Sequence, residues 1–446
     1  MALSGIQIYQ LLPQTNCKEC GFPTCMAFAM KLAAKQAELA ACPYVSDEAK
    51  EKLSAAAQPP VRLITLKADD HEVKAGNETV LFRHEKKFFN KPGLFVRVRD
   101  SEPLDALKAR VAAADAYRVN YVGMDLSLDG FAVETVSGDA ATFADAVSAV
   151  REVSERPLIL MGRDPAVIAA GLKPIDGEVP LLVGADASNW EAMADVAKGA
   201  GAALAVIADT LDGLVALSSR LKDKGVENLV LAPATRRLGS SLGFYTQIRR
   251  LALKKNFRPL GYPILAVPGD APDEATEALL AAQAIAKYAG FVVLDTIAPE
   301  LLYPLLVLRE NLYTDPQKPI QVQPGVYEFN SPTPESPVLV TTNFSITYFS
   351  VANEVEGSGL PAHLLVTDAE GMSVLTAWAA GKFDAERIAK AVKEFSLNEK
   401  VSRKRIVLPG HVAVLSGELE EELPGWEVRV GPREAVDIPA FMKQAL

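Results

Sequence analysis

Short apolar runs alternate with longer amphipathic segments through the middle of the chain. Each run is followed by a polar or turn residue and then by a helix-length segment rich in alanine and leucine. The runs cover residues 94–98, 121–126, 158–161, 181–183, 204–207, 229–232, 264–267 and 291–294. Because eight strand–helix units in succession close a TIM (β/α)8 barrel, the pattern predicts such a barrel over residues 93–315.

A second α/β pattern fills residues 337–446, with strands expected at 338–340, 363–366, 406–408 and 426–430. We expect an open, Rossmann-like parallel sheet. Ligands of such sheets bind beyond the carboxyl ends of the strands. The turns after the strands, above all the three that contain glycine, therefore mark the expected pocket.

Prolines are dense between the two patterns, at Pro316, Pro319, Pro324, Pro332, Pro334 and Pro337. Repeated proline stiffens a chain and denies it helix. We therefore expect a connector over residues 316–336 and a domain boundary there.

Charged and polar residues follow the predicted barrel strands, where TIM-barrel enzymes place their chemistry. They are Asp100, Asp125, Arg163, Asp164, Asp186, Asp209, Thr235, Asp270 and Asp295. Aspartate is also a favoured helix N-cap, and many of these residues directly precede a predicted helix. We interpret them mainly as helix N-caps and as partners in loop hydrogen bonds, so the barrel is expected to be a scaffold with no catalytic residue.

All four cysteines of the chain lie near its start, at Cys17, Cys20, Cys25 and Cys42. Three closely spaced cysteines on a loop and a fourth cysteine further along the chain suit a 4Fe-4S cluster, in which one thiolate binds each iron. Apolar residues at helical spacing after Cys25 are expected to carry the fourth ligand back. We predict a cluster domain over residues 1–58, with a further short helix at 46–57, and then a linker with a hairpin over residues 59–92.

Two other interpretations of the four thiols remain open. Structural zinc usually takes two close pairs of ligands on two turns, unlike this spacing. A disulfide framework is typical of small secreted domains, whereas this chain has 446 residues and starts without a charged segment followed by an apolar one.

Composition narrows the classes of partner. A net charge of -10 disfavours nucleic acid, because phosphate binding needs a basic surface. No stretch approaches the roughly 18 uninterrupted apolar residues of a membrane span. We expect a cytoplasmic protein with neither a nucleic-acid nor a membrane partner.

The whole chain resembles the large (gamma) subunits of the corrinoid iron-sulfur proteins of the acetyl-CoA (Wood–Ljungdahl) pathway, which are related to gamma subunits of acetyl-CoA decarbonylase/synthase. The cysteine spacing, closed by Cys42-Pro43, and the eight-unit barrel carry part of the resemblance. The rest lies in the C-terminal stretches 341–347, Thr-Thr-Asn-Phe-Ser-Ile-Thr, and 371–374, Gly-Met-Ser-Val.

The resemblance implies a cobalamin-type corrinoid, a cobalt cofactor, in the C-terminal domain. In this family the protein accepts a methyl group from methyltetrahydrofolate through a separate methyltransferase and delivers it to acetyl-CoA synthase/CO dehydrogenase. The 4Fe-4S cluster reactivates Co(II) to Co(I). The resemblance also implies a heterodimer with the family's small subunit and movement at linkers near Pro59 and Pro324.

Turn positions and the motif match together give the expected corrinoid-binding residues. They are Thr341, Ile346, Thr347, Gly371, Met372, Ser373, Val374, Gly410 and Ala435. The motif Asp-x-His-x-x-Gly, with which many corrinoid domains place a histidine under cobalt, is absent. A pocket without a strong axial donor eases the reduction of Co(II).

Three rival interpretations remain. A pterin-dependent methyltransferase would do chemistry in its own barrel, and an electron-transfer iron-sulfur protein would use the C-terminal domain only for assembly. The related archaeal subunit would take its methyl group from a methanopterin.

Overall fold

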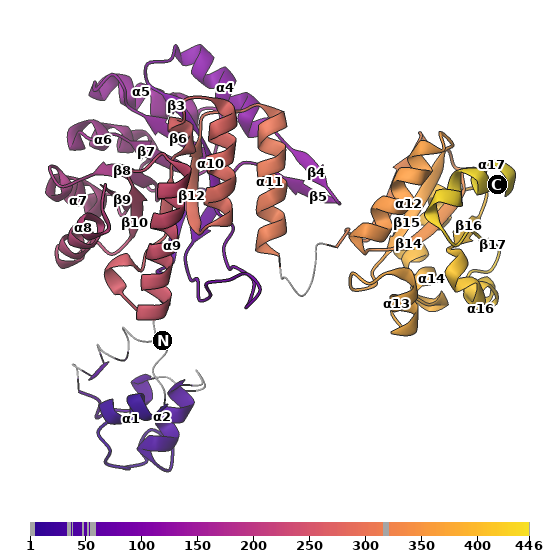
Figure 1. Ribbon diagram of the computed structural model, residues 1–446, viewed down its shortest axis with the longest axis horizontal. Coiled ribbons are helices and arrows are strands. Elements are labelled where there is room, and N and C mark those ends of the chain that lie inside the picture. Colours follow the sequence, from indigo (N-terminus) through magenta and orange to yellow (C-terminus); the bar gives the residue numbers. More distant parts are fainter. Residues whose placement is uncertain are drawn as a thin grey trace. The chain divides into compact units, whose positions relative to one another are not determined.

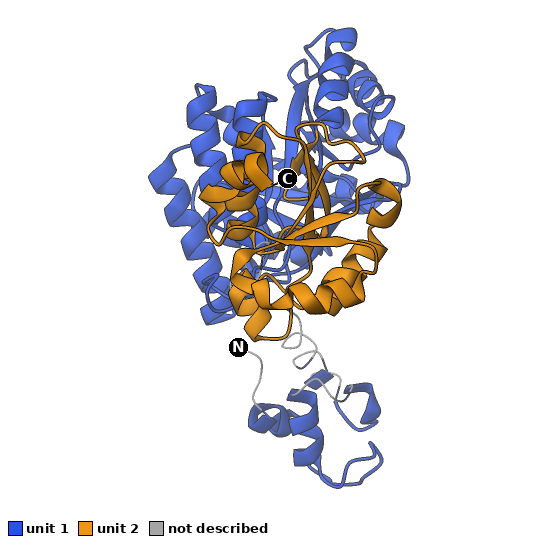
Figure 2. Ribbon diagram, turned by 90° about the vertical axis from the view of Figure 1, so that its right-hand side faces the viewer, with its two compact units in different colours: residues 1–117, 127–313 blue, residues 118–126, 314–446 orange. Residues whose placement is uncertain are grey.

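The computed structural model describes residues 5–33, 37, 39–46, 49–50, 53, 59–314 and 321–445. The chain divides into two compact units, one of residues 1–117 and 127–313, the other of residues 118–126 and 314–446 (Figure 2). Each unit is described by itself below. No described helix is both long and apolar enough to cross a membrane.

The cysteine segment begins with two short helices, α1 (Gly5–Leu11) and α2 (Cys25–Ala33), drawn in indigo in Figure 1. They pack through a small apolar core that includes Ile8 and Phe28. A 3₁₀ turn, η1 (Leu39–Ala41), precedes Cys42. The helix expected over 46–57 falls largely outside the described residues.

A closed barrel of eight parallel strands forms most of the first unit, which confirms the predicted architecture. Its strands are β3 (Gly93–Arg99), β6 (Gly130–Glu134), β7 (Leu158–Met161), β8 (Leu181–Ala185), β9 (Ala203–Ala208), β10 (Leu229–Pro233), β11 (Ile264–Ala266) and β12 (Ala289–Leu294). The interior is filled by apolar side chains such as Phe95 and Phe291.

Helices surround the barrel between successive strands (Figure 1). They are α4 (Leu104–Ala116), α5 (Ala140–Arg151), α6 (Pro165–Leu172), α7 (Trp190–Gly199), α8 (Leu211–Asp223), α9 (Leu238–Lys255), α10 (Glu274–Ala286) and α11 (Pro299–Tyr313). The 3₁₀ turns η2 (Lys173–Ile175), η3 (Arg258–Leu260) and η4 (Pro268–Asp270) complete the connections.

One predicted barrel strand, 121–126, is wrong. These residues belong to an antiparallel hairpin of β4 (Val119–Tyr121) and β5 (Met124–Leu126), and Asp125 lies on it rather than at the barrel mouth. Val122 and Gly123 have positive φ angles, and the turn that they form interrupts the run before it is long enough for a barrel strand. The apolar side chains of this run pack in the second unit, while β6 supplies the eighth barrel strand.

The hairpin expected within residues 59–92 is present and closes the amino end of the barrel. It consists of β1 (Ile64–Ala68) and β2 (His71–Ala75), and its apolar side chains join the barrel core. A Cβ at Gly93, the first residue of β3, would lie 2.6 Å from Val73 Cγ1. The hairpin is therefore part of the barrel fold rather than a loose linker.

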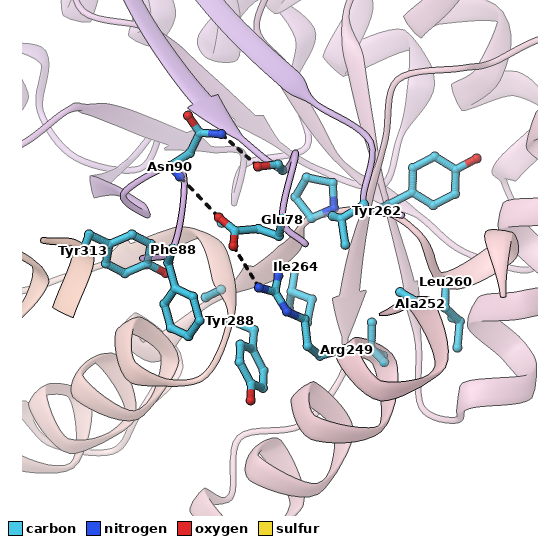
Figure 3. Close-up of a pocket in the computed structure, with 16 residues that line it drawn as sticks. Glu78, Phe88, Asn90, Arg249, Ala252, Leu260, Tyr262, Ile264, Tyr288 and Tyr313 are labelled. Carbon is cyan, nitrogen blue, oxygen red and sulfur yellow. Dashed lines mark hydrogen bonds and ion pairs between the residues drawn. The ribbon is translucent and has the colours of Figure 1, made fainter. Parts of the chain in front are cut away.

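Beside this hairpin lies a small cavity of about 20 Å³ (Figure 3). Glu78 accepts hydrogen bonds from the backbone N–H groups of Phe89 at 2.8 Å and Asn90 at 3.2 Å. Its second oxygen pairs with Arg249 at 2.8 Å, and the Arg249 guanidinium lies 4.9 Å from the Tyr288 ring centroid. The volume suits one water molecule, so this cavity is no candidate for a substrate site.

The carboxyl end of the barrel is filled by ion pairs. Arg97 is 1% exposed and donates to both carboxylate oxygens of Asp295, at 2.7 and 3.0 Å, and to Asp270 at 2.6 Å. Arg99 bridges Asp295 at 2.7 Å and Glu134 at 3.1 Å. Burial raises the pKa of Asp295, but hydrogen bonds from Arg97 and Arg99 outweigh it and leave the pKa lowered.

The acidic residues expected after the barrel strands therefore take different roles. Asp164 caps α6, as expected, by accepting a hydrogen bond from a backbone N–H at 2.8 Å. Asp186 accepts a backbone hydrogen bond within its own loop, whereas Asp100 accepts one from Ser137 in the loop after β6. Asp270 and Asp295 pair with a buried arginine instead of capping helices.

The second unit contains a five-stranded sheet in the order β13-β15-β14-β16-β17. These strands are β13 (Gly325–Phe329), β14 (Val338–Thr342), β15 (Ala362–Thr367), β16 (Arg405–Leu408) and β17 (Glu427–Val430). The last four are parallel, as predicted, and β13 is antiparallel to β15. Part of the expected proline-rich connector thus forms an edge strand, while Pro316 and Pro319 lie outside the described residues.

Alternate side chains of β14 enter two apolar cores, one on each face of this sheet. Leu339 packs with α12 (Ser345–Gly357) and α17 (Ile438–Ala445). Val338 and Val340 pack with α13 (Val374–Ala379), α14 (Ala385–Glu394) and α16 (Ser416–Glu422). The remaining elements are α15 (Leu397–Lys400), η5 (Gly410–Leu415) and η6 (Ala435–Asp437).

Replacing Arg97 with methionine should destabilise the barrel by about 2 kcal/mol, because it removes the charge-assisted hydrogen bonds that this buried arginine donates to Asp295 and Asp270. Hydrogen exchange of barrel peptides measures this loss. Because the pKa of Asp295 is lowered, its stabilising contribution is present above the usual carboxylate pKa of about 4 and disappears as the pH falls through its folded value.

The matched control is Arg163→Met, since Arg163 is 75% exposed in its pair with Asp186 and should contribute less than about 1 kcal/mol. Equal exchange rates in the two variants would contradict a stabilising role for the ion pairs at the barrel mouth.

Candidate functional site

The C-terminal sheet has a topological switch point at β14. From β14 the chain crosses first to β15 on one side and later to β16 on the other. The ladder between β14 and β16 is short. Val338 pairs with Ile406 and Leu339 with Val407, and the two strands, which are described over their full length, form no further pair with each other. The two strands therefore separate at their carboxyl ends, where open α/β sheets bind ligands.

A pocket of about 290 Å³ occupies this crevice. Three residues of its lining, Leu339, Val407 and Ile438, also belong to the apolar core under α12 and α17. The polar residues that line it are Thr341, Thr347, Ser350, Ser373, His411, Arg433 and Glu434. Apolar lining with a few polar groups is typical of a small-molecule site.

Thr341 carries the clearest sign of a missing ligand. Its side chain lines the pocket and is 1% exposed, yet its hydroxyl has no hydrogen-bond partner among the described residues. Burying an unpaired hydroxyl costs stability, and native proteins rarely leave one. A ligand with a polar group at this point would satisfy it.

Six of the nine predicted corrinoid-binding residues come together at this pocket. They are Thr341, Ile346, Thr347, Ser373, Val374 and Ala435. They come from the consecutive elements β14 and α12, from the start of α13 and from η6, so three separate stretches of the chain meet here.

The other three, Gly371, Met372 and Gly410, lie outside the pocket lining. Gly371 has φ +72° and donates its N–H to Asn343 Oδ1 at 3.0 Å, so it shapes the turn before α13. Gly410 donates its N–H to Pro432 O at 2.9 Å, and a Cβ there would lie 2.6 Å from a carbonyl oxygen. Both glycines fit supporting positions behind the walls.

Several lining residues were missed by sequence reasoning. They include Val340, Val351, Leu375 and Leu408. Val340 and Leu408 lie on β14 and β16, and their place in the lining follows from the strand order. Pro409, His411 and Gly431–Pro432 lie in glycine-containing turns that the sequence marked as the expected pocket, and His411 Nε2 lies 3.8 Å from Glu434 Oε1.

Exposed apolar side chains accompany the pocket. Ile346 and Leu375 line it and are exposed, and Val436 is exposed in η6 directly after the lining residue Ala435. Apolar surface in this arrangement is typical of a site covered by a ligand or a partner.

The cysteine segment forms a second candidate site. Cys25 and Cys42 are buried, Cys20 is partly buried against the same apolar core, and Cys17 is exposed. Asn16 accepts a hydrogen bond from the Cys25 N–H at 2.8 Å, and its own N–H donates to the Cys25 sulfur at 3.4 Å. Backbone donors of this kind stabilise thiolates.

A hydrogen bond ties the two ends of this segment together. The Tyr44 hydroxyl donates to Glu19 at 2.8 Å. This hydrogen bond raises the pKa of Tyr44, with smaller increases from the charges of Glu19, Cys17 and Cys42 and from burial.

The donor set fits an iron-sulfur cluster, because four thiols belong to one small, partly apolar region. Within the part of the chain that the structure describes, no three histidine, cysteine or acidic side chains are grouped closely enough to hold a metal ion. The cysteines stay the predicted ligands, and no cluster geometry is assigned to them.

Comparison with known proteins agrees with this arrangement. A family model described as "CO dehydrogenase/acetyl-CoA synthase delta subunit" matches residues 63–442, and one described as "Putative Fe-S cluster" matches residues 12–44, which hold all four cysteines. The "Corrinoid/iron-sulfur protein large subunit" of Moorella thermoacetica is 46% identical over 446 residues, covering 100% of both chains. This chain belongs to the family of corrinoid/iron-sulfur protein large subunits.

Archaeal members are more distant. The "Acetyl-CoA decarbonylase/synthase complex subunit gamma" of Methanopyrus kandleri is 36% identical over 455 residues, covering 99% of this chain and 98% of the relative. Among solved structures, dihydropteroate synthase from Thermus thermophilus aligns at 18% identity and a TM-score of 0.39, covering 56% of this chain and 99% of that chain.

Replacing Thr341 with valine should stabilise the ligand-free second unit by about 1 kcal/mol, because valine keeps the shape and removes the unpaired hydroxyl. Thr342→Val is the matched comparison, since the Thr342 hydroxyl is also buried and unpartnered among the described residues but lies outside the pocket lining. Urea titration followed by hydrogen exchange of peptides from residues 337–445 measures both. Destabilisation by Thr341→Val would mean that its hydroxyl is already paired.

Proposed function

We propose that this chain is the methyl-carrying subunit of an acetyl-CoA-forming or acetyl-CoA-cleaving system. It holds a corrinoid in the C-terminal pocket and a 4Fe-4S cluster on its four cysteines. The observation that carries the proposal is the buried, unpartnered Thr341 hydroxyl in an apolar pocket at the sheet's switch point, in a chain of this family. When bound, the corrinoid supplies a cobalt that accepts and releases a methyl group, and the cluster supplies single electrons.

The pocket residues fit the task of binding a large, mostly apolar macrocycle. Leu339, Val407 and Ile438 offer apolar contact, while the Thr341 hydroxyl can bond a peripheral amide of the ring. The exposed Ile346 and Leu375 can lie against a ring that extends beyond the 290 Å³ of the pocket. These residues bind and orient the ring.

The histidine of the pocket fits a role other than a strong cobalt ligand. His411 Nε2 lies 3.8 Å from Glu434 Oε1, so a carboxylate lies near this imidazole. A pocket without a strong nitrogen donor would suit a cobalt cofactor that must return to a reduced state. This agrees with the absence of the Asp-x-His-x-x-Gly motif.

The four cysteines fit a cluster that restores the reduced cofactor. Cys25 and Cys42 are buried, which excludes water from two ligand positions, and the exposed Cys17 leaves one side open to a donor or acceptor of electrons. Cys17, Cys20, Cys25 and Cys42 would each hold one iron.

The barrel fits a scaffold better than a pterin-dependent catalyst. The carboxylates at its mouth, Asp270 and Asp295, are paired with arginines: both accept hydrogen bonds from Arg97, and Asp295 also accepts one from Arg99. A base or pterin ligand needs carboxylates that are free to meet the substrate. This pairing opposes the rival in which the barrel itself transfers the methyl group.

The proposed partners follow from the family and from the open pocket. We propose a small subunit as heterodimer partner, a methyltetrahydrofolate-dependent methyltransferase as methyl donor, and acetyl-CoA synthase/CO dehydrogenase as acceptor. The exposed apolar residues Ile346 and Val436 would be covered when one of them docks. A methanopterin donor is the alternative, because the relative from Methanopyrus kandleri is 36% identical over nearly the whole chain.

Replacing Cys20 with alanine should abolish bound iron while cobalt content stays at the wild-type level, because the two sites share no residue. Iron and cobalt are measured on anaerobically purified protein supplied with cobalamin. The control is Met30→Ala, an exposed residue of α2, which should retain both metals. Parallel loss of cobalt and iron in the cysteine variant would refute the separation of the two sites.

Thr341→Val should weaken cobalamin retention about tenfold, which corresponds to one lost hydrogen bond of roughly 1.4 kcal/mol. Thr342→Val should leave retention unchanged. Equilibrium dialysis against cobalamin measures both. Unchanged retention in both variants would remove the Thr341 hydroxyl from the binding site.

A further inference from the structure

The hairpin of residues 118–126, here called the arm, is inserted in the barrel sequence between α4 and β6 but packs within the second unit. Val122 at its tip is 7% exposed and shares an apolar core with Val322 of the connector. The Val122 carbonyl accepts a hydrogen bond from the Gln323 N–H at 3.1 Å. The arm therefore packs against the segment that leads into the C-terminal sheet and forms a hydrogen bond with it.

The tip of the arm has a strained backbone where it packs against this segment. Val122 has φ +48°, a conformation that β-branched residues avoid, and Gly123 has φ +83°. A Cβ at Gly123 would lie 2.7 Å from the Tyr327 hydroxyl and 2.8 Å from Gln323 Cβ. Strain of this kind persists only when the surroundings determine the conformation.

The apolar core that contains the tip of the arm extends to the pocket. The Tyr327 ring lies 5.0 Å from that of Tyr348, which sits on α12 between pocket-lining residues. The core that contains Val122 also contains Leu339, Val407 and Ile438 of the pocket lining. The arm therefore packs into the core that lies behind one pocket wall.

The same connector also reaches the turn before α13. The Val322 N–H donates to the Asn343 carbonyl at 2.9 Å, and the Asn343 side chain donates to Gln321 at 3.2 Å. The Asn343 oxygen Oδ1 accepts hydrogen bonds from the N–H groups of Ala369, at 2.9 Å, and Gly371, at 3.0 Å. The connector thus contacts the supports of two pocket walls.

We propose that the arm is an intramolecular docking element that positions α12, so that arm docking and ligand binding in the C-terminal pocket are positively coupled. Val122 is a positioning residue that acts through Tyr327 and Tyr348. This inference rests on the proposed function only for the identity of the ligand. By linkage, a ligand that favours the docked packing must in turn stabilise the arm.

Val122→Asp separates docking from hairpin formation. Asp-Gly is a favoured pair for this two-residue turn, so the hairpin persists, while a carboxylate cannot enter the apolar core. Amide exchange of residues 321–329 and of α12 should become about tenfold faster, within the range typical of coupled sites. Leu279→Asp, at a 63% exposed position of α10, is the control and should change neither segment.

The second measurement adds cobalamin to the wild-type protein. Slower exchange of residues 118–126, none of which lines the pocket, would support the coupling. Protection confined to pocket peptides would overturn it. If cobalamin protects no peptide, the proposed ligand is wrong, while the Val122→Asp result still decides the arm: unchanged exchange of α12 would refute its positioning role.

Discussion

The separation of β14 and β16 beyond the Leu339–Val407 pair is the constraint on which the functional account depends. Parallel strands that stay paired would bury their carboxyl ends against each other and leave no room for a ligand. Here the chain crosses in opposite directions from β14, so the helices that follow cover different faces and the strands part. The crevice is apolar because both strands donate core residues to its floor, and Thr341 leaves one hydroxyl there to be satisfied.

The barrel, although it is the larger unit, is closed at both ends by its own groups. The hairpin of β1 and β2 fills the amino end, and Arg97 with its carboxylate partners fills the carboxyl end where barrel enzymes bind substrates. The barrel still contributes to the second unit, because the arm leaves its sequence and packs against the connector.

The sequence predicted features that depend on local pattern. The cysteine spacing, seven of the eight barrel strands and the four parallel strands of the C-terminal sheet all follow from residue order and apolar runs. Features that depend on contacts between residues far apart in the sequence were not predicted. The run at 121–126 is apolar because it packs on Val322 rather than in the barrel, and β13 gains its strand character from pairing with β15. The turn that contains His411 was expected at the pocket, but the approach of His411 to Glu434 depends on the strand order.

The anaerobic absorption spectrum and metal content of the full chain, produced with its small partner and supplied with corrinoid, test the central claim most directly. The account predicts about four iron and one cobalt per chain, with a corrinoid band that changes on reduction. Iron without cobalt would reduce the chain to an electron-transfer protein, and zinc alone would contradict the assignment of the four cysteines.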